Sequence, residues 1–102
     1  MTATTAFKIL THQQWADFER ERVFRGAPVD IADGYIHLST AEQLEGTLAK
    51  HFAGQTELMI AEVDLICLAD AIRWEEARGG ELFPHLYAEL PITAVIGLQK
   101  RD

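Results

Sequence analysis

The sequence is poor in cysteine and carries no recognisable export signal. Its 102 residues include one cysteine, Cys67, so no disulfide can form within the chain. Chains without disulfides are typical of reducing compartments. The N-terminal stretch "MTATTAFKILTH" contains neither the basic segment nor the long apolar segment of a signal peptide. These absences predict a cytoplasmic protein.

Positive charge and long apolar runs are also scarce. The chain has 9 Lys and Arg against 16 Asp and Glu, for a formal net charge of −7. Its one basic cluster, Arg20, Arg22 and Arg25, is interleaved with Glu19 and Glu21. Nucleic-acid partners are therefore not expected, although a small phosphate-bearing ligand remains compatible. No apolar run approaches the ~20 residues of a membrane span, so no membrane partner is expected.

The remaining composition is typical of one globular domain. Hydrophobic residues make up 48% of the chain and charged residues 25%. A chain of this length buries roughly two thirds of its unfolded surface, which suffices for a core. We expect a single domain over residues 1–102, with the small and polar residues 1–6 disordered.

Periodicity and capping signals predict two helices and several strands. Thr11 followed by Gln14 fits a capping box, and a second helix is predicted from near Ala41 to Gly54. Pro84 shifts its strand toward a sheet edge or a bulge. Helices early and strands late predict an α+β fold with mixed, largely antiparallel sheets. The predicted strands are 7–10, 23–24, 35–39, 58–63, 72–75, 82–90 and 94–99.

The stretch "DGYIHLST" combines a core face with a polar face. With the period of two that strands have, Ile36 and Leu38 point to one side. Tyr35, His37 and Ser39 point to the other side, where they could take part in binding or catalysis.

A second stretch, "LFPHLYAEL", has the same pattern. Phe83, His85 and Tyr87 share one strand face, so both stretches read aromatic-x-His-x-hydroxyl. If the two faces line one cleft, they form a polar site walled by aromatic rings, which is typical of small-ligand pockets. That site would consist of Tyr35, His37, Ser39, His85 and Tyr87. In the alternative interpretation, each histidine is a half-buried structural residue.

Other candidate residues have competing explanations. Ser39 with Glu42, and Thr40 with Gln43, are overlapping capping boxes, so helix capping explains at least one hydroxyl. Glu75 follows a tryptophan, where a carboxylate of raised pKa could act as acid or base. The alternative is a solvated acidic loop.

His37, His85 and Glu75 could also form a metal set of two histidines and one carboxylate. No H-x-H or H-E-x-x-H spacing supports that set, and motifs such as G-x-G-x-x-G and the P-loop are absent. We therefore assign no metal ligands.

The two motifs, with "FKIL" and "LMIAEVDL", resemble the bacterial domain-of-unknown-function family 952 over roughly Phe7 to Leu98. That family's fold is similar to the ADP-ribosyltransferase fold, in which small α+β domains cradle NAD in a cleft between two sheets. The resemblance implies an ADP-ribosyltransferase-like fold and makes NAD a candidate cofactor. The segment "HLST" resembles the Ser-Thr element of those enzymes, which implies nucleotide contacts for His37, Ser39 and Thr40. Their late glutamate has no clear counterpart, and Glu75 is a candidate by chemistry only.

Two functional hypotheses follow. In the first, the cleft binds NAD or another nucleotide-like ligand; in an enzymatic version, His37 orients it and Glu75 or His85 acts as acid or base. In the second, the protein is a non-catalytic binding or interaction module whose histidines are structural. Metal-assisted hydrolysis is a further alternative. The sequence does not distinguish among them.

Overall fold

The computed structural model describes residues 3–101, apart from the side chain of Arg78, and has the predicted α+β class. Its α-helices are α1 (His12–Glu21), α2 (Pro28–Asp33) and α3 (Ala41–His51). Its strands are β1 (Thr5–Leu10), β2 (Val23–Phe24), β3 (Ile36–His37), β4 (Leu58–Asp64), β5 (Ile72–Glu76), β6 (Leu82–Leu86), β7 (Leu90–Pro91) and β8 (Val95–Arg101). Short 3-10 helices cover Ala69–Ala71, Arg78–Gly80 and Ile92–Ala94. None of the described helices is long and apolar enough to cross a membrane.

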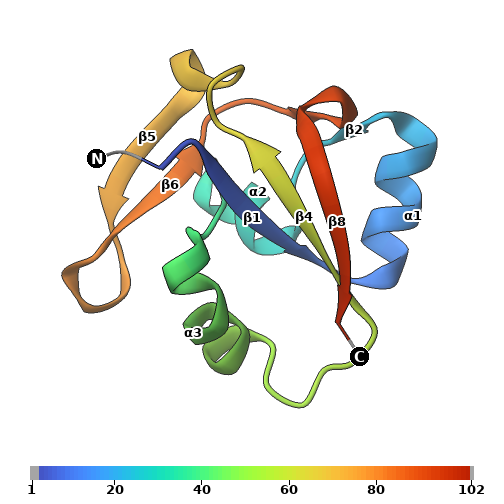
Figure 1. Ribbon diagram of the computed structural model, residues 1–102, viewed down its shortest axis with the longest axis horizontal. Coiled ribbons are helices and arrows are strands. Elements are labelled where there is room, and N and C mark those ends of the chain that lie inside the picture. The colour runs from blue at the N-terminus through green and yellow to red at the C-terminus, as the bar shows by residue number, and fades with distance from the viewer. Residues whose placement is uncertain (1–2, 102) are drawn as a thin grey trace.

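The strands form sheets of order β1-β4-β8, β2-β7 and β3-β6-β5. Every described strand pair is antiparallel, so the sheets are not mixed as we expected. Strand β4 lies between β1 and β8, and the β5–β6 hairpin stands apart from that sheet (Figure 1). The predicted strands at 58–63 and 94–99 are thereby confirmed within a residue or two at each end.

The first strand begins earlier than predicted. Thr5 pairs with Asp64 of β4, and Ala6 is fully buried, so both belong to β1 and are not disordered. Of the expected disordered segment 1–6, residues 1–2 lie outside the described residues.

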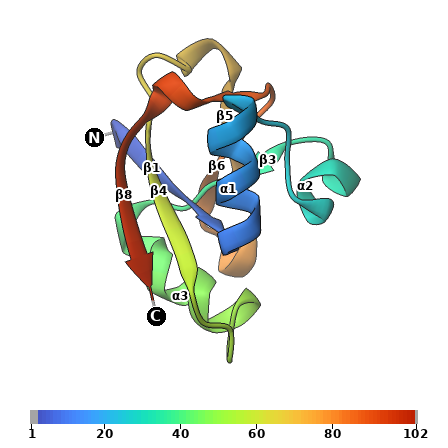
Figure 2. The same cartoon turned by 90° about the vertical axis from the view of Figure 1, so that its right-hand side faces the viewer.

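Alternate residues of β1 and β4 pack against different helices. Ala6 and Leu10 lie in the core cluster that contains Phe18 of α1. Ile9 lies in the second cluster, with Leu44 of α3. Because successive strand residues point to opposite faces, α1 and α3 cover opposite sides of this sheet. In Figure 2, α1 faces the viewer and α3 lies near the lower ends of β4 and β8.

The prediction of two helices is wrong, because α2 forms within the segment expected to be a loop. Pro28 occupies the start of α2, where a proline costs no helical hydrogen bond. The Asp30 carboxylate accepts a 2.7 Å hydrogen bond from the backbone N–H of Ala27, just before the helix. Gly34 ends the helix with a φ of 88°, a left-handed conformation that glycine adopts without a steric penalty.

Pro84 lies in a central strand, not at the sheet edge or bulge that we predicted. Its carbonyl accepts a 3.2 Å hydrogen bond from the Leu38 N–H. Two residues that lie opposite each other in such an antiparallel pair normally exchange two hydrogen bonds. The second bond would run from the backbone N–H of residue 84 to Leu38, and proline has no such N–H. Pairing with β6 ends at this point, which explains why β3 comprises only Ile36–His37.

Candidate functional site

The segment 36–39 passes from one sheet to another. In β3, His37 lies directly opposite His85 of β6. Two residues later, Ser39 exchanges backbone hydrogen bonds of 2.7 and 2.9 Å with Phe7 of β1. The chain therefore carries His37 and Ser39 across the junction of two sheets.

The two histidines and a tyrosine form one ring cluster. The ring centroids of His37 and His85 are 5.5 Å apart. The Tyr35 ring stacks on His85 at 4.1 Å and an angle of 22°, and lies 4.6 Å from the His37 ring. The Tyr87 ring lies 5.2 Å from that of Tyr35. Four of the five residues predicted to meet, Tyr35, His37, His85 and Tyr87, lie together in this cluster. Ser39 is not part of it, and its hydroxyl lies beside that of Thr47.

Glu75 joins this cluster through two hydrogen bonds. Its Oε1 accepts one from Nδ1 of His85 and one from the Tyr87 hydroxyl, both 2.8 Å long. These bonds lower the pKa of Glu75 and raise that of Tyr87. Glu75 is therefore not a carboxyl with a raised pKa, as its place beside Trp74 had suggested. It serves as the carboxylate partner of a histidine.

His37 lies between two carboxylates. Its Nδ1 is 2.6 Å from Oδ1 of Asp30, and its Nε2 is 2.9 Å from Oδ2 of Asp33. The His37 backbone N–H donates a further 3.0 Å bond to Asp30. Both ring nitrogens of His37 therefore face a carboxylate oxygen. His37 is thus held in a fixed orientation.

Asp30 in turn forms a buried ion pair with Lys8, at 2.9 Å. Asp30 is 1% exposed and Lys8 is 5% exposed. Burial disfavours the charge of Asp30, but bonds from His37, the charge of Lys8 and the Ala27 N–H outweigh burial and lower its pKa to about 2. Burial also lowers the pKa of Lys8, against the opposing effect of Asp30.

The sequence analysis missed Lys8, Asp30 and Asp33. A signal was present, because Lys8 falls on the same face of its strand as buried Ala6 and Leu10. A lysine at a core position requires a buried carboxylate partner. Nothing in the sequence indicates which aspartate supplies it.

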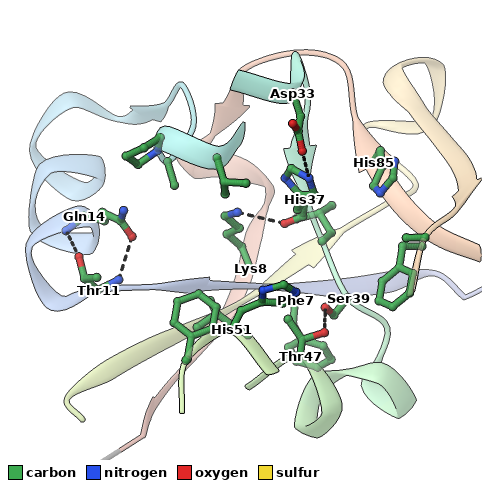
Figure 3. Close-up of a pocket in the computed structure, with 18 of the residues that line it drawn as sticks. Phe7, Lys8, Thr11, Gln14, Asp33, His37, Ser39, Thr47, His51 and His85 are labelled. Carbon is green, nitrogen blue, oxygen red and sulfur yellow. Dashed lines mark hydrogen bonds and ion pairs between the residues drawn. The ribbon is translucent and has the colours of Figure 1, made fainter. Parts of the chain in front are cut away.

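A cavity of about 600 Å³ lies beside the histidine pair (Figure 3). His37, His85 and Ser39 line it, and the Ser39 hydroxyl lies 2.9 Å from that of Thr47. Lys8 also lines the cavity, and its ammonium donates to the His37 carbonyl at 3.1 Å. The walls are mainly apolar and include Phe7, Ile9, Val29, Leu38, Phe52 and Phe83.

The other candidate residues lie outside this cavity. Tyr35 and Tyr87 line a second cavity of about 350 Å³. The Thr40 hydroxyl accepts a 3.2 Å hydrogen bond from the backbone N–H of Gln43 and caps α3. Capping therefore accounts for this hydroxyl, and Thr40 is not among the described residues that line the main cavity. Within residues 3–101, no group of three or more His, Cys, Asp or Glu is arranged to hold a metal ion.

Comparisons with known proteins identify related sequences and structures. The family described as "Protein of unknown function (DUF952)" matches residues 9–98. The crystal structure of protein CC0527 from Caulobacter crescentus is 40% identical, with a TM-score of 0.93, and the match covers 97% of this chain and 87% of that one. The solution NMR structure of the same protein is 40% identical, with a TM-score of 0.84 and coverage of 95% and 84%. The comparison with curated proteins gave no match.

Proposed function

The chain belongs to the DUF952 family, and we propose that its main cavity binds a small nucleotide-like ligand, with NAD the first candidate. The volume of about 600 Å³ lies within the ~300–1,000 Å³ range of small-molecule sites. Its phenylalanine side chains, Phe7, Phe52 and Phe83, offer apolar surface to a flat ring.

One observation supports ligand binding above all others: a few polar groups converge on one mainly apolar cavity. The side chains of His37 and His85 reach it from the β3-β6-β5 sheet, and that of Ser39 from the residue that bridges to Phe7 of β1. Binding sites for small molecules typically combine apolar walls with a few polar groups that fix orientation.

The choice of NAD rests on the resemblance to ADP-ribosyltransferases. Those enzymes cradle NAD between two sheets, and the segment "HLST" crosses a junction of two sheets in this chain. We propose on this basis that the fold is of the ADP-ribosyltransferase type.

Thermal denaturation of chelator-treated protein with and without millimolar NAD tests ligand binding. A ligand at 100 times its Kd stabilises a protein by about 2.7 kcal/mol. Because 1 kcal/mol raises the Tm of a domain this size by about 4–8 °C, wild type should show a rise of about 10 °C or more. His85→Gln should show a smaller rise, and the control variant His12→Gln, at an exposed position of α1, the wild-type rise. No rise in wild type would contradict NAD binding.

The contacts that the His37 ring makes within the protein favour an alternative function, that of a non-catalytic interaction module. Both ring nitrogens of His37 already face carboxylates, as expected for a structural residue. This alternative predicts that His37→Ala lowers the melting temperature and leaves the response to NAD unchanged from wild type. An NAD response that disappears in a folded His37→Ala protein would contradict a purely structural histidine.

A further inference from the structure

We propose that His85 is a general base, oriented by Glu75, which activates a water molecule against an uncharged or cationic carbon centre of the bound ligand. This role rests on the proposed ligand binding and adds a reaction to it. It assigns different tasks to two histidines that the sequence motifs present as equivalent.

The first support is the hydrogen bonding of the His85 ring. Nδ1 of His85 lies 2.8 Å from the Glu75 carboxylate, which can only accept. A proton on Nδ1 leaves Nε2 of the neutral ring as an acceptor. Among the described residues, only Glu75 forms a hydrogen bond with this ring, and His85 lines the cavity. Nε2 can therefore accept a proton from a molecule bound there.

The second support is that the ring is held firmly. The His85 side chain is 3% exposed, and the Tyr35 ring stacks on it at 4.1 Å. The Tyr87 hydroxyl donates to the same Oε1 that binds His85, which fixes the carboxylate. The two side chains lie on β5 and β6, which pair through five residues each. A carboxylate that orients a histidine is the usual support of a general base.

His37 is not equipped for the same task. Its Nδ1 faces Asp30 and its Nε2 faces Asp33, so neither nitrogen is available as an acceptor. The distinction depends on Asp33, which has no equivalent at His85.

The charges near the histidine pair indicate the class of reacting centre. The carboxylates Asp30, Asp33 and Glu75 all contact this pair. Of the nearby cations, Lys8 is bound to Asp30, and Arg73 lies over the Tyr87 ring at 4.7 Å. Lys8 and Arg73 are already engaged, and the Glu75 carboxylate is bonded to His85 itself, so an anionic phosphate at Nε2 of His85 would approach that carboxylate without a cation placed to receive it. An uncharged or cationic carbon would not be repelled.

The proposed step balances as a hydrolysis. Nε2 of His85 takes a proton from water while the water oxygen forms a bond to the carbon centre. The bond from that carbon to the leaving group breaks, and the leaving group departs with the bonding electron pair. The leaving group then takes the proton from the His85 ring, which restores the starting state.

Hydrolysis of 4-nitrophenyl acetate, an uncharged ester, tests the base directly. We expect wild type to release 4-nitrophenolate about tenfold faster, or more, than His85→Gln and Glu75→Gln. The Glu75→Gln side chain can present an amide N–H to the histidine, which would favour the wrong tautomer. Glu75→Asp should recover part of the rate, which a merely structural role of Glu75 would not predict. The exposed control variant His12→Gln should hydrolyse the ester like wild type.

Equal rates of ester hydrolysis for wild type, Glu75→Gln and His85→Gln would contradict the assignment of His85 as a general base. With bis(4-nitrophenyl) phosphate, which is anionic, we expect no rate that depends on His85. Faster hydrolysis of this diester by wild type than by His85→Gln would overturn the assigned class of reacting centre. The effect of NAD on the melting temperature is measured separately. The experiments therefore distinguish an absence of NAD binding from an absence of general-base catalysis by His85.

Discussion

His37 and His85 face each other on paired strands, but their surroundings differ. His37 is bound at both ring nitrogens, by Asp30 and Asp33, and Asp30 is anchored to the buried Lys8. His85 is bound at one nitrogen, by Glu75, and its ring borders the cavity. We therefore propose that two motifs of the same pattern supply one residue that stabilises the fold and one that acts on a ligand.

This difference follows from where the carboxylates lie. Asp30 and Asp33 lie on α2, a short helix directly before β3, so they reach His37 from within its own segment. Glu75 reaches His85 from the neighbouring strand β5 and contacts only one edge of the ring. We infer that the His37 region (His37 with Asp30 and Asp33) determines stability and that the His85 region (His85 with Glu75) determines chemistry. Each variant below changes one region and leaves the other intact.

The largest effect is expected for Asp30→Ala. This change leaves the Lys8 ammonium buried without its carboxylate, and loss of one partner of a buried ion pair costs about 3–5 kcal/mol. Urea denaturation measures the loss. The control variant Asp33→Ala removes a carboxylate that is 46% exposed and should cost no more than about 1 kcal/mol. Equal losses for the two variants would contradict the special place of the buried pair.

A smaller loss is expected for His37→Ala. It removes hydrogen bonds to Asp30 and Asp33, and the loss of such bonds lowers the free energy of unfolding by about 1–3 kcal/mol. The same denaturation experiment measures it, with His12→Ala as the exposed control. A His37→Ala protein as stable as wild type would show that His37 does not hold this region together.

Acidification should weaken the His37 region selectively. The folded-state pKa of Asp30, about 2, lies below the usual aspartate value of 3.8. Its ionisation therefore stabilises the fold above about pH 4, and this contribution of about 2 kcal/mol is lost as the pH falls toward 2. Denaturation curves over this range should show a steeper loss for wild type than for Asp30→Asn. Parallel losses would contradict the low pKa.

The smallest effect on stability is expected for Glu75→Gln. Glu75 is 39% exposed, and Gln retains an oxygen that can accept from the Tyr87 hydroxyl. Its melting temperature should match that of Glu81→Gln, a control at an exposed position near the same hairpin. A clear drop for Glu75→Gln alone would show that the His85 region also determines stability.

Much of the fold could be predicted from sequence because its signals are local. The capping box of Thr11 and Gln14 starts α1 as predicted, with bonds of 3.1 and 2.9 Å. The period-two pattern placed Ile36 and Leu38 in the core, where both are 2% exposed. Helix α2 was missed because its six residues are too few for a helical apolar stripe.

The candidate site was predictable only in part. The repeated aromatic-x-His-x-hydroxyl pattern identified His37 and His85, since both lie on strands. The Lys8–Asp30 pair depends on contacts 22 residues apart, which no local pattern encodes. The roles of Ser39 and Thr40 could not be separated from sequence, because both precede the same helix and differ only in the direction of their side chains.

The most direct test of the difference between the two histidines is a long-range ¹H–¹⁵N correlation spectrum of histidine-labelled protein at neutral pH. Side-chain signals are assigned with His37→Ala and His85→Gln. We predict that both ring nitrogens of His37 show the signals of hydrogen bonding to a carboxylate, whereas only Nδ1 of His85 does. The same hydrogen-bonding pattern in both rings would contradict the division into a structural and a catalytic histidine.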